Sequence, residues 1–401
     1  GVLVLGVVFG LKPGAIPVDV ILIIMGVIAA IAAMQVAGGL DYLVHIAARI
    51  LKSNPKYITF LAPIVTYTMT MFAGTGHTAF STLPVIAEVA KREGIRPSRP
   101  LSIATVGAQI GITASPISAA VVFFSSELEK YGVDYVKLLM IAIPSSFIAV
   151  MLGAFIANFL GKELKDDPVY QDRLAKGLVS MDSKDDQQVE ITPEAKRAVL
   201  IFGVSIFAVV SYAMAISSTF NLIENPILER DHAIITFMLG AATLITLFCK
   251  VDAKNILNAA TFKSGMSACI CVLGVAWLGT TFVAAHMEEI NVFAGALLTK
   301  YPWMLAVVLF FAAMLLYSQA ATTKALMPAA LALGVSPVAA IAAFASVSAL
   351  FILPTYPTLL AAVEFDDTGS TRVGKYVFDH PFLIPGVCTI TFAVALGFVF
   401  G

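Results

Sequence analysis

The stretches Gly74-Thr75-Gly76-His77 and Ser115-Pro116 put turn chemistry inside two successive apolar runs. The second half of the chain repeats the arrangement with Gln319-Ala320-Ala321-Thr322-Thr323-Lys324 and then Pro354-Thr355-Tyr356-Pro357. Each break falls at about the depth where a membrane helix should be continuous. Paired broken helices at corresponding positions of two halves indicate a secondary transporter and point to its binding site.

The composition also indicates a membrane protein. Hydrophobic residues make up 59% of the chain and charged residues 13%, and the mean hydropathy is +0.91. Uncharged stretches, most of them long enough to cross a bilayer, cover 20–40, 101–126, 138–161, 198–223, 233–249, 264–287 and 381–401. The sequence therefore predicts an all-α, polytopic membrane protein.

Two further apolar stretches, 57–90 and 301–335, are too long for one span and too broken for an ordinary helix. If both are re-entrant hairpins, the loops near 49–57, 91–99, 161–197, 250–263 and 363–380 fall on one side and hold 19 of the 25 Lys and Arg residues. Treating either stretch as a plain span would destroy this bias. The positive-inside rule therefore favours two re-entrant hairpins.

The two halves can be superimposed by spacing. Placing Pro84 on Pro328 brings Thr78 opposite Thr322, and broken helices follow at about 100–126 and 337–362. The spans that precede the two hairpins run in opposite directions, so the sequence predicts an inverted-topology repeat. We expect a first repeat at 1–160, a cytoplasmic linker at 161–197 and a second repeat at 198–401.

The breaks also supply helix N-termini. Ser115 can cap a helix that begins at Pro116, and Pro357 can begin another. After the hairpin tips, Thr78 and either Thr322 or Thr323 are candidate caps. Four N-termini near the midplane, each equivalent to roughly +0.5 charge, favour a small anion with two negative ends.

Each individual polar residue has more than one possible role. Lys324 costs roughly 2.5–3.5 kcal/mol at the centre of a membrane helix, so it either attracts the substrate or reaches cavity water. His77 either donates to a carboxylate, carries a proton or caps its own loop. Hydroxyl and amide groups at the breaks can bind a carboxylate or satisfy freed backbone groups. The candidate substrate-binding residues are Thr75, Gly76, His77, Thr78, Gln109, Ser115, Ser118, Ser318, Gln319, Thr322, Thr323, Lys324, Thr355 and Tyr356, and the helix breaks lie at Pro116, Pro354 and Pro357.

Other classes of site find little support. The four cysteines sit singly in apolar runs, so we expect no metal site, and no cofactor is indicated. The pair Asp366-Asp367 resembles half of a metal-diphosphate motif without a matching second cluster, which argues against an enzyme. Because the chain starts without Met on an apolar run, we expect that an earlier span precedes Gly1.

Several long motifs resemble one family over essentially the whole chain. They are Ala73-Gly74-Thr75-Gly76-His77, Gly107-Ala108-Gln109-Ile110-Gly111-Ile112-Thr113-Ala114-Ser115-Pro116, Tyr317-Ser318-Gln319-Ala320-Ala321 and Phe351-Ile352-Leu353-Pro354-Thr355-Tyr356-Pro357-Thr358. They are similar to motifs of the anaerobic four-carbon dicarboxylate transporters of bacteria, the Dcu family, and most like its A branch.

The resemblance implies a multi-pass protein of the bacterial inner membrane that exchanges fumarate, malate or aspartate for succinate in anaerobic growth. It also implies an elevator-type fold of the ion-transporter superfamily, with a scaffold that often dimerises. Small dicarboxylates and the lipid bilayer are then the partners, and no nucleic acid is involved. A homodimer and contact with a membrane sensor kinase are additional hypotheses.

A proton- or sodium-coupled symporter of the same acids, or of an acidic amino acid, is the alternative. His77 is the residue that proton coupling would involve. The sodium-coupled relatives carry Ser-Asn-Thr at each tip, whereas this chain has Gly-Thr-Gly-His and Ala-Ala-Thr-Thr. The resemblance therefore argues against sodium coupling.

Overall fold

The computed structural model describes residues 1–14, 16, 18–179, 191–216, 222–271, 300–354 and 356–401, with isolated residues between 273 and 286. Every regular element in these residues is a helix, which confirms the predicted all-α class. Among them, the helices long and apolar enough to cross a membrane are α7 (Tyr135–Ala157), α9 (Pro193–Ile216), α10 (Arg230–Phe248) and α20 (Leu383–Phe400). A further candidate span is the bent pair α1 (Val18–Val36) and α2 (Gly39–Ser53), whose axes differ by 73°.

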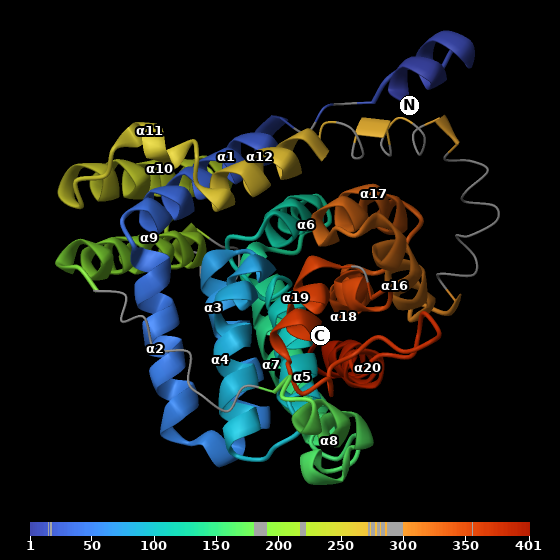
Figure 1. Cartoon of the computed structure of the whole chain (residues 1–401). Coiled ribbons are helices and arrows are strands. Elements are labelled where there is room, and N and C mark those ends of the chain that lie inside the picture. Colours follow the sequence, from blue (N-terminus) through green and yellow to red (C-terminus); the bar gives the residue numbers. More distant parts are fainter. Residues whose placement is uncertain are drawn as a thin grey trace.

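Two pairs of consecutive helices occupy the stretches expected to form hairpins (Figure 1). The first pair is α3 (Ile58–Ala73) and α4 (Ala79–Arg92), joined through the short 3-10 turn η3 (Gly76–Thr78). The second pair is α16 (Met304–Leu316) and α17 (Gln319–Ala332). We call the turns 74–78 and 317–319 the two tips.

At each tip, the first helix of the pair ends at a residue whose backbone adopts the left-handed conformation. Gly74 adopts φ 66° after α3, where a glycine has no Cβ to clash. Tyr317 adopts φ 51° after α16, an uncommon value for a residue with a side chain. Ser318 then caps α17, because its Oγ accepts a hydrogen bond from the N–H of Ala321 at 3.2 Å.

The two expected broken helices are also interrupted. In the first half, α5 (Ser98–Gly111) is followed by an irregular segment and then α6 (Ala119–Glu129). In the second half, α18 (Pro337–Ala343) continues as the 3-10 helix η7 (Phe344–Phe351), and α19 (Pro357–Phe365) follows the break. Pro357 is the first residue of α19, and Tyr356 precedes it as the N-cap.

The first break differs in detail from the expected Ser115 cap with a helix start at Pro116. Helix α6 begins at Ala119, and its cap is Ser118, whose Oγ accepts from the N–H of Val121 at 3.2 Å. Pro116 lies in the irregular segment before the helix, where its carbonyl oxygen accepts from the hydroxyl of Tyr135 at 2.5 Å. Helix α6 therefore starts after Ser118, because its hydroxyl accepts from an N–H of the first turn that has no partner within the helix.

Tip-bearing and broken helices pack closely together. A Cβ on Gly111 would lie 2.9 Å from the carbonyl oxygen of Tyr67 on α3, so only glycine permits this approach of α5. Thr66 strengthens the contact by donating from Oγ1 to the carbonyl oxygen of Ala104 at 2.7 Å. Helices α3–α7 and α16–α20 share two adjoining apolar cores, and we call them the central block.

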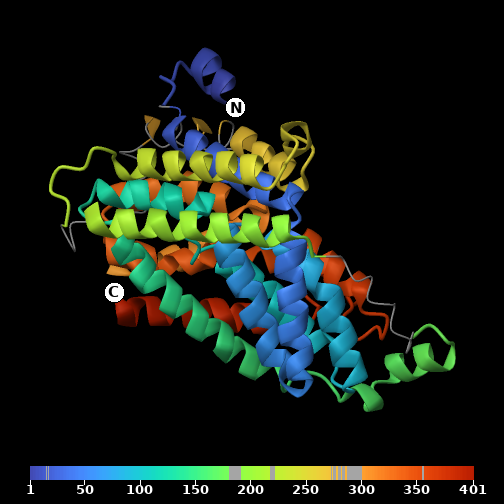
Figure 2. The same cartoon turned by 90° about the vertical axis from the view of Figure 1, so that its left-hand side faces the viewer.

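Helices α1, α9 and α10 form a separate packed group beside the central block. Their shared core contains Val27 and Met34 of α1, Phe202 of α9, and Met238 and Ile245 of α10. Figure 2 shows α9 and α10 running side by side along this face of the molecule. We call this set the peripheral group. The remaining short elements are η1 (Val4–Val8), η2 (Pro55–Tyr57), η4 (Leu164–Asp166), α8 (Pro168–Ala175), α11 (Ala253–Ile256) and α12 (Ala260–Cys271).

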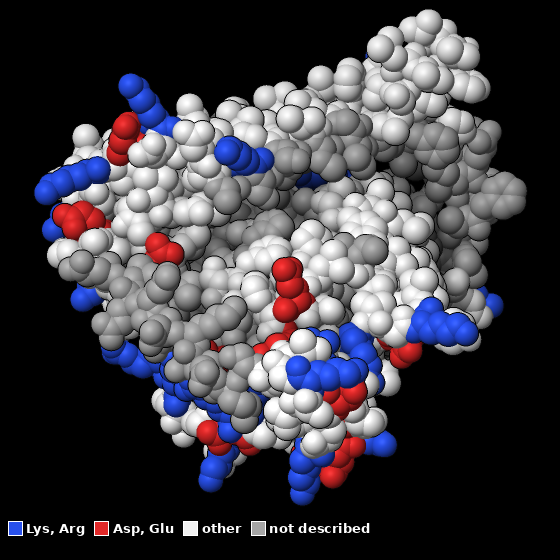
Figure 3. Space-filling view, in the orientation of Figure 1, with Lys and Arg blue, Asp and Glu red and all other residues white. Residues whose placement is uncertain are grey.

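Charged side chains gather at the edge of the molecule around α8 and at the ends of α10 and α11 (Figure 3). Near α8, Arg96 pairs with Asp167, which caps that helix. Burial alone would raise the pKa of Asp167, but the N–H of Val169 and the Arg96 guanidinium outweigh burial and hold it below its usual value. The first part of the expected linker is therefore fixed to the central block.

The loop after α19 completes this charged end. The carboxylate of Asp366 is buried and accepts bonds from the N–H and hydroxyl of Thr368, the hydroxyl of Ser370 and the N–H of Thr371. Ser370 also accepts from the N–H of Ser98 at the start of α5, at 3.1 Å. Asp367 pairs with Lys91 of α4 at 2.8 Å. We call residues 366–371 the clamp loop.

We expect Asp366→Ala to destabilise the folded protein by about 3 kcal/mol, because several buried donors lose their acceptor at once. The measurement is the apparent melting temperature of the purified protein in detergent. Asp172→Ala is the matched control: its carboxylate pairs with Lys176 on the surface, so the change should stay within about 0.5 kcal/mol. Equal melting temperatures for the two variants would contradict this account of the clamp loop.

Candidate substrate site

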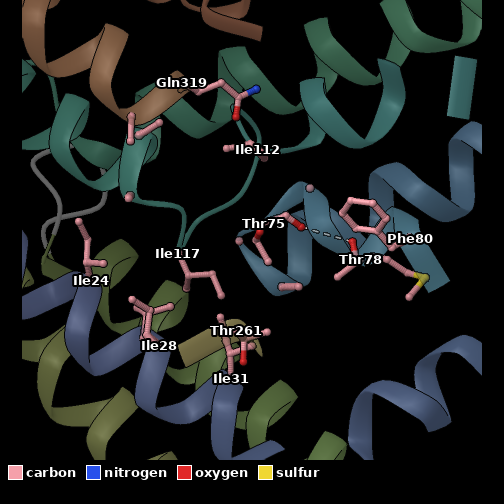
Figure 4. A pocket seen from close by; sticks show the side chains of 18 of the residues that line it. Ile24, Ile28, Ile31, Thr75, Thr78, Phe80, Ile112, Ile117, Thr261 and Gln319 are labelled. Atoms are coloured by element: carbon pink, nitrogen blue, oxygen red, sulfur yellow. Dashed lines mark hydrogen bonds between the residues drawn. The ribbon is translucent and has the colours of Figure 1, made fainter. Parts of the chain in front are cut away.

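A cavity of about 720 Å³ lies between the central block and α1 (Figure 4). One wall comes from both tips and both broken helices, and consists of Met69, Ala73, Gly74, Thr75, Gly76, Thr78, Phe80, Ser81, Ile112, Ile117, Ala119, Ala120, Tyr317, Ser318, Gln319, Ala320, Leu350 and Tyr356. The other wall comes from α1, α2 and α12, and consists of Ile24, Val27, Ile28, Ile31, Gln35, Leu40, Val44 and Thr261. Among these lining residues none is Asp, Glu, Lys or Arg.

Four helices begin at this cavity: α4, α6, α17 and α19. Ser118 and Ser318 cap α6 and α17 with their own hydroxyl groups. Thr78 and Tyr356, the N-caps of α4 and α19, make no side-chain cap bond. The cavity therefore meets the positive ends of four helix dipoles, and the starts of α4 and α19 lack a side-chain acceptor.

The first tip brings together most of its predicted residues. Thr75 lines the cavity, and its carbonyl oxygen accepts from Oγ1 of Thr78 at 3.3 Å, which Figure 4 marks with a dashed line. Thr78 also bonds Thr70 of α3 at 3.2 Å. Gly76 lies against α5, where a Cβ would stand 3.5 Å from the carbonyl oxygen of Ala108. The side chain of His77 lies outside the described residues.

At the second tip, Gln319 connects three elements. Its Nε2 donates to the backbone oxygen of Gln109 on α5 at 2.6 Å and to Oγ of Ser348 on η7 at 2.9 Å. Ser318 and Gln319 line the cavity, whereas Thr322 and Thr323 do not. These two threonines are buried and bond back to the carbonyl oxygens of Ser318 and Gln319, at 2.8 and 2.7 Å.

Three predicted residues lie behind the cavity wall. Lys324 is 1% exposed, and its Nζ lies 5.8 Å from the ring centroid of Phe123 on α6. Ser115 accepts from the N–H of Ile117 at 3.4 Å. Gln109 is buried, and neither polar atom of its side chain has a hydrogen-bond partner within the described part of the chain.

The second break contributes an aromatic contact. Tyr356 lines the cavity and stacks on Tyr317, with ring centroids 6.2 Å apart and planes 14° apart. Pro354 lies in the break itself, and Thr355 lies outside the described residues. No group of three His, Cys, Asp or Glu residues that could hold a metal ion occurs in the part that the structure describes.

The sequence reasoning missed the wall formed by α1, α2 and α12. Among the described residues of this wall, Gln35 and Thr261 are the polar ones. A signal was present, because Gln35 ends an apolar stripe of α1 that includes Ile24, Ile28 and Ile31 at helical spacing. Its connection to Thr261 could not be read from the sequence, since the two residues are far apart along the chain.

Comparison with known proteins shows the family of this chain. The family model described as the anaerobic C4-dicarboxylate membrane transporter, covering the transporters DcuA and DcuB, matches residues 1–401. The chain belongs to this family. This confirms the resemblance inferred from the sequence motifs.

The relatives give the degree of similarity. The C4-dicarboxylate transporter DcuA of Wolinella succinogenes is 65% identical over 399 residues, which cover 100% of this chain and 92% of that protein. DcuA of Escherichia coli K12 is 58% identical over 402 residues, with the same coverage. The anaerobic C4-dicarboxylate transporter DcuB of Escherichia coli O6:H1 is 37% identical over 409 residues, so the chain is more similar to these DcuA proteins.

A solved structure supports the fold independently. The chain is similar to MtrF of Neisseria gonorrhoeae, described among a class of antimetabolite efflux pumps, with a TM-score of 0.62 and 14% sequence identity. The match covers 99% of this chain and 83% of MtrF. At this identity the likeness concerns the fold alone. As a member of the Dcu family, the chain is an inner-membrane transporter and no enzyme.

Proposed function

We propose that this protein exchanges C4-dicarboxylates across the bacterial inner membrane, with fumarate, malate or aspartate entering and succinate leaving. The observation that carries the proposal is the cavity between the tips and α1. Its lining includes no acidic side chain among the described residues, and four helices begin at it. Such a cavity suits an anion, and transport of C4-dicarboxylates is the function of the family.

The two tips are the proposed holders of one carboxylate. Thr75 and Thr78 present hydroxyl and backbone groups at the start of α4, and Ser318 and Gln319 do the same at the start of α17. Hydrogen bonds to a charged oxygen contribute about 1.5–3 kcal/mol each when formed in a dry site. Gly76 keeps the backbone open to the ligand.

The residues behind the wall have a supporting role in this proposal. Thr322 and Thr323 satisfy carbonyl groups at the second tip. At the first break, Ser118 donates to the carbonyl oxygen of Ile112, and Ser115 accepts from the N–H of Ile117. Lys324 acts by its charge through the wall, since it does not line the cavity. For these residues, which do not line the cavity, we therefore propose a supporting role in place of direct contact with the substrate.

We further propose the membrane arrangement expected from the sequence. Repeats 1–160 and 198–401 are inverted, the paired helices are re-entrant hairpins, and 161–197 lies in the cytoplasm with most of the positive charge. The central block carries the substrate and moves as an elevator against the peripheral group. The peripheral group is also the surface at which a homodimer would form.

Exchange follows from charge. An empty cavity that meets four helix N-termini resists crossing the low-dielectric membrane, and a bound dianion neutralises it. The test is counterflow into proteoliposomes, with labelled fumarate outside and succinate, aspartate or nothing trapped inside. We expect uptake only with trapped dicarboxylate, independent of sodium and proton gradients.

Uptake into empty vesicles at full rate would overturn exchange. If a proton or sodium gradient drove that uptake, the protein would be a symporter, and His77 would be the first residue to change. Uptake that depends on trapped dicarboxylate but fails for acids with one carboxylate would support the proposal further.

A further inference from the structure

A single polar side chain ends the apolar stripe on the α1 wall of the cavity. Ile24, Ile28, Ile31 and Gln35 follow one another at spacings of four, three and four residues, so they share one face of α1. All four line the cavity. Figure 4 shows Ile28 and Ile31 on the wall opposite the first tip.

The orientation of the Gln35 amide is fixed by its neighbour on α12. Its Oε1 accepts two hydrogen bonds from Thr261, one from the backbone N–H at 3.2 Å and one from Oγ1 at 2.7 Å. A backbone N–H can only donate, so the atom that it meets must be the amide oxygen. The Nε2 group, with two N–H donors, is therefore at the other end of the amide.

Nothing in the described part of the chain accepts a hydrogen bond from Gln35 Nε2, and the side chain is only half-buried because it borders the cavity. We propose that Gln35 binds the second carboxylate of the substrate through Nε2 and so selects dicarboxylates over monocarboxylates. The inference rests on the proposed function, in which the tips hold the first carboxylate.

The chemistry of the wall supports this role. A carboxylate placed against Ile28 and Ile31 loses water and needs a donor in its place. Among the described residues, Gln35 and Thr261 supply the polar side-chain atoms of that wall. The N–H and the hydroxyl of Thr261 both donate to the Gln35 amide oxygen, so neither is left for the substrate. A neutral donor also leaves the charge balance of the cavity to the substrate, as exchange requires.

The experiment compares fumarate with crotonate, which keeps the four-carbon chain and the trans double bond of fumarate but has a methyl group in place of one carboxylate. Sites built to hydrogen-bond a group reject the analogue that lacks it. In Gln35→Leu we expect the KM for fumarate counterflow to rise about tenfold or more. The ratio of inhibition by fumarate to inhibition by crotonate should fall by the same factor.

Gln35→Glu keeps the size and the acceptor for Thr261 but turns a negative oxygen to the cavity. We expect a larger loss of fumarate affinity than in Gln35→Leu, together with an unchanged melting temperature. Gln171→Leu is the matched control, because this exposed glutamine on α8 lies far along the chain from the cavity and should leave both KM and ratio unchanged.

The outcomes separate the two proposals. If the unmodified protein carries out counterflow and a folded Gln35→Leu keeps both its KM and its fumarate-to-crotonate ratio, the role of Gln35 is wrong and exchange stands. If the unmodified protein shows no dicarboxylate counterflow, the proposed function is overturned and this inference with it.

Discussion

Replacing Gln319 by leucine should lower the rate of fumarate counterflow about a hundredfold. Its amide joins the second tip to Gln109 on α5 and to Ser348 on η7, and all three residues are buried. Leucine has nearly the same size but no donor, so the second tip loses both hydrogen bonds that hold it to α5 and η7. Two lost hydrogen bonds at up to about 1.5 kcal/mol each correspond to this factor, since 1.36 kcal/mol is tenfold in rate.

The measurement is initial counterflow into succinate-loaded proteoliposomes, normalised to the amount of reconstituted protein. Gln171→Leu again serves as the control for the same chemical change on the surface. A rate for Gln319→Leu within a few-fold of the unmodified protein would show that the junction does not organise the site.

Gly386→Val should destabilise the fold at a position outside the cavity. Gly386 lies on α20 where a Cβ would stand 2.3–2.6 Å from ring atoms of Phe351, and this ring is completely buried. A larger side chain must push Phe351 and the end of η7 towards the second break. Overpacking of this kind costs about 1–3 kcal/mol or more, so the apparent melting temperature should fall by several degrees.

Gly203→Val on α9 is the control, because no atom lies within 4 Å of the position that its Cβ would take. It should leave the melting temperature close to that of the unmodified protein. A similar fall in both variants would mean that valine in a helix is the cause, and the contact with Phe351 would then carry no special weight.

The boundaries of the tip-bearing helices could be predicted because their signals are local. The stretches expected at 57–90 and 301–335 contain α3 with α4 and α16 with α17. Glycine at 74 and proline at 357 act on the backbone of their own neighbours, so a sequence pattern reveals them. The one-sided distribution of Lys and Arg depends on both stretches being re-entrant, so it stays a prediction.

The direction of single side chains could not be predicted in the same way. Thr322, Thr323 and Lys324 follow the second tip, yet all three turn away from the cavity. The phase of a helix is set by its packing partners, and a threonine hydroxyl can bond back to its own helix. Ser118 replaced Ser115 as the cap for a similar reason, because a shift of a few residues decides which hydroxyl meets an open N–H.

Long-range contacts were the other gap. The sequence predicts a linker at 161–197 but not its contacts: Asp167 and Arg173 in its first part bond Arg96 and the backbone of Asp367. These partners come from distant parts of the chain, so no local pattern announces them. The contact between Gln35 and Thr261 could not be predicted for the same reason, because the two residues are far apart along the chain.

The clamp loop has a mechanical consequence for the whole molecule. It attaches the second half of the chain to the start of α5 through Ser98 and to the end of α4 through Lys91. Gln319 attaches the two halves a second time, at the tips, through its bond to Gln109. Two separate attachments restrict the motion of the two halves relative to each other. In the proposed elevator motion we therefore expect both halves of the binding site to move together as one body, with the sliding surface along α1.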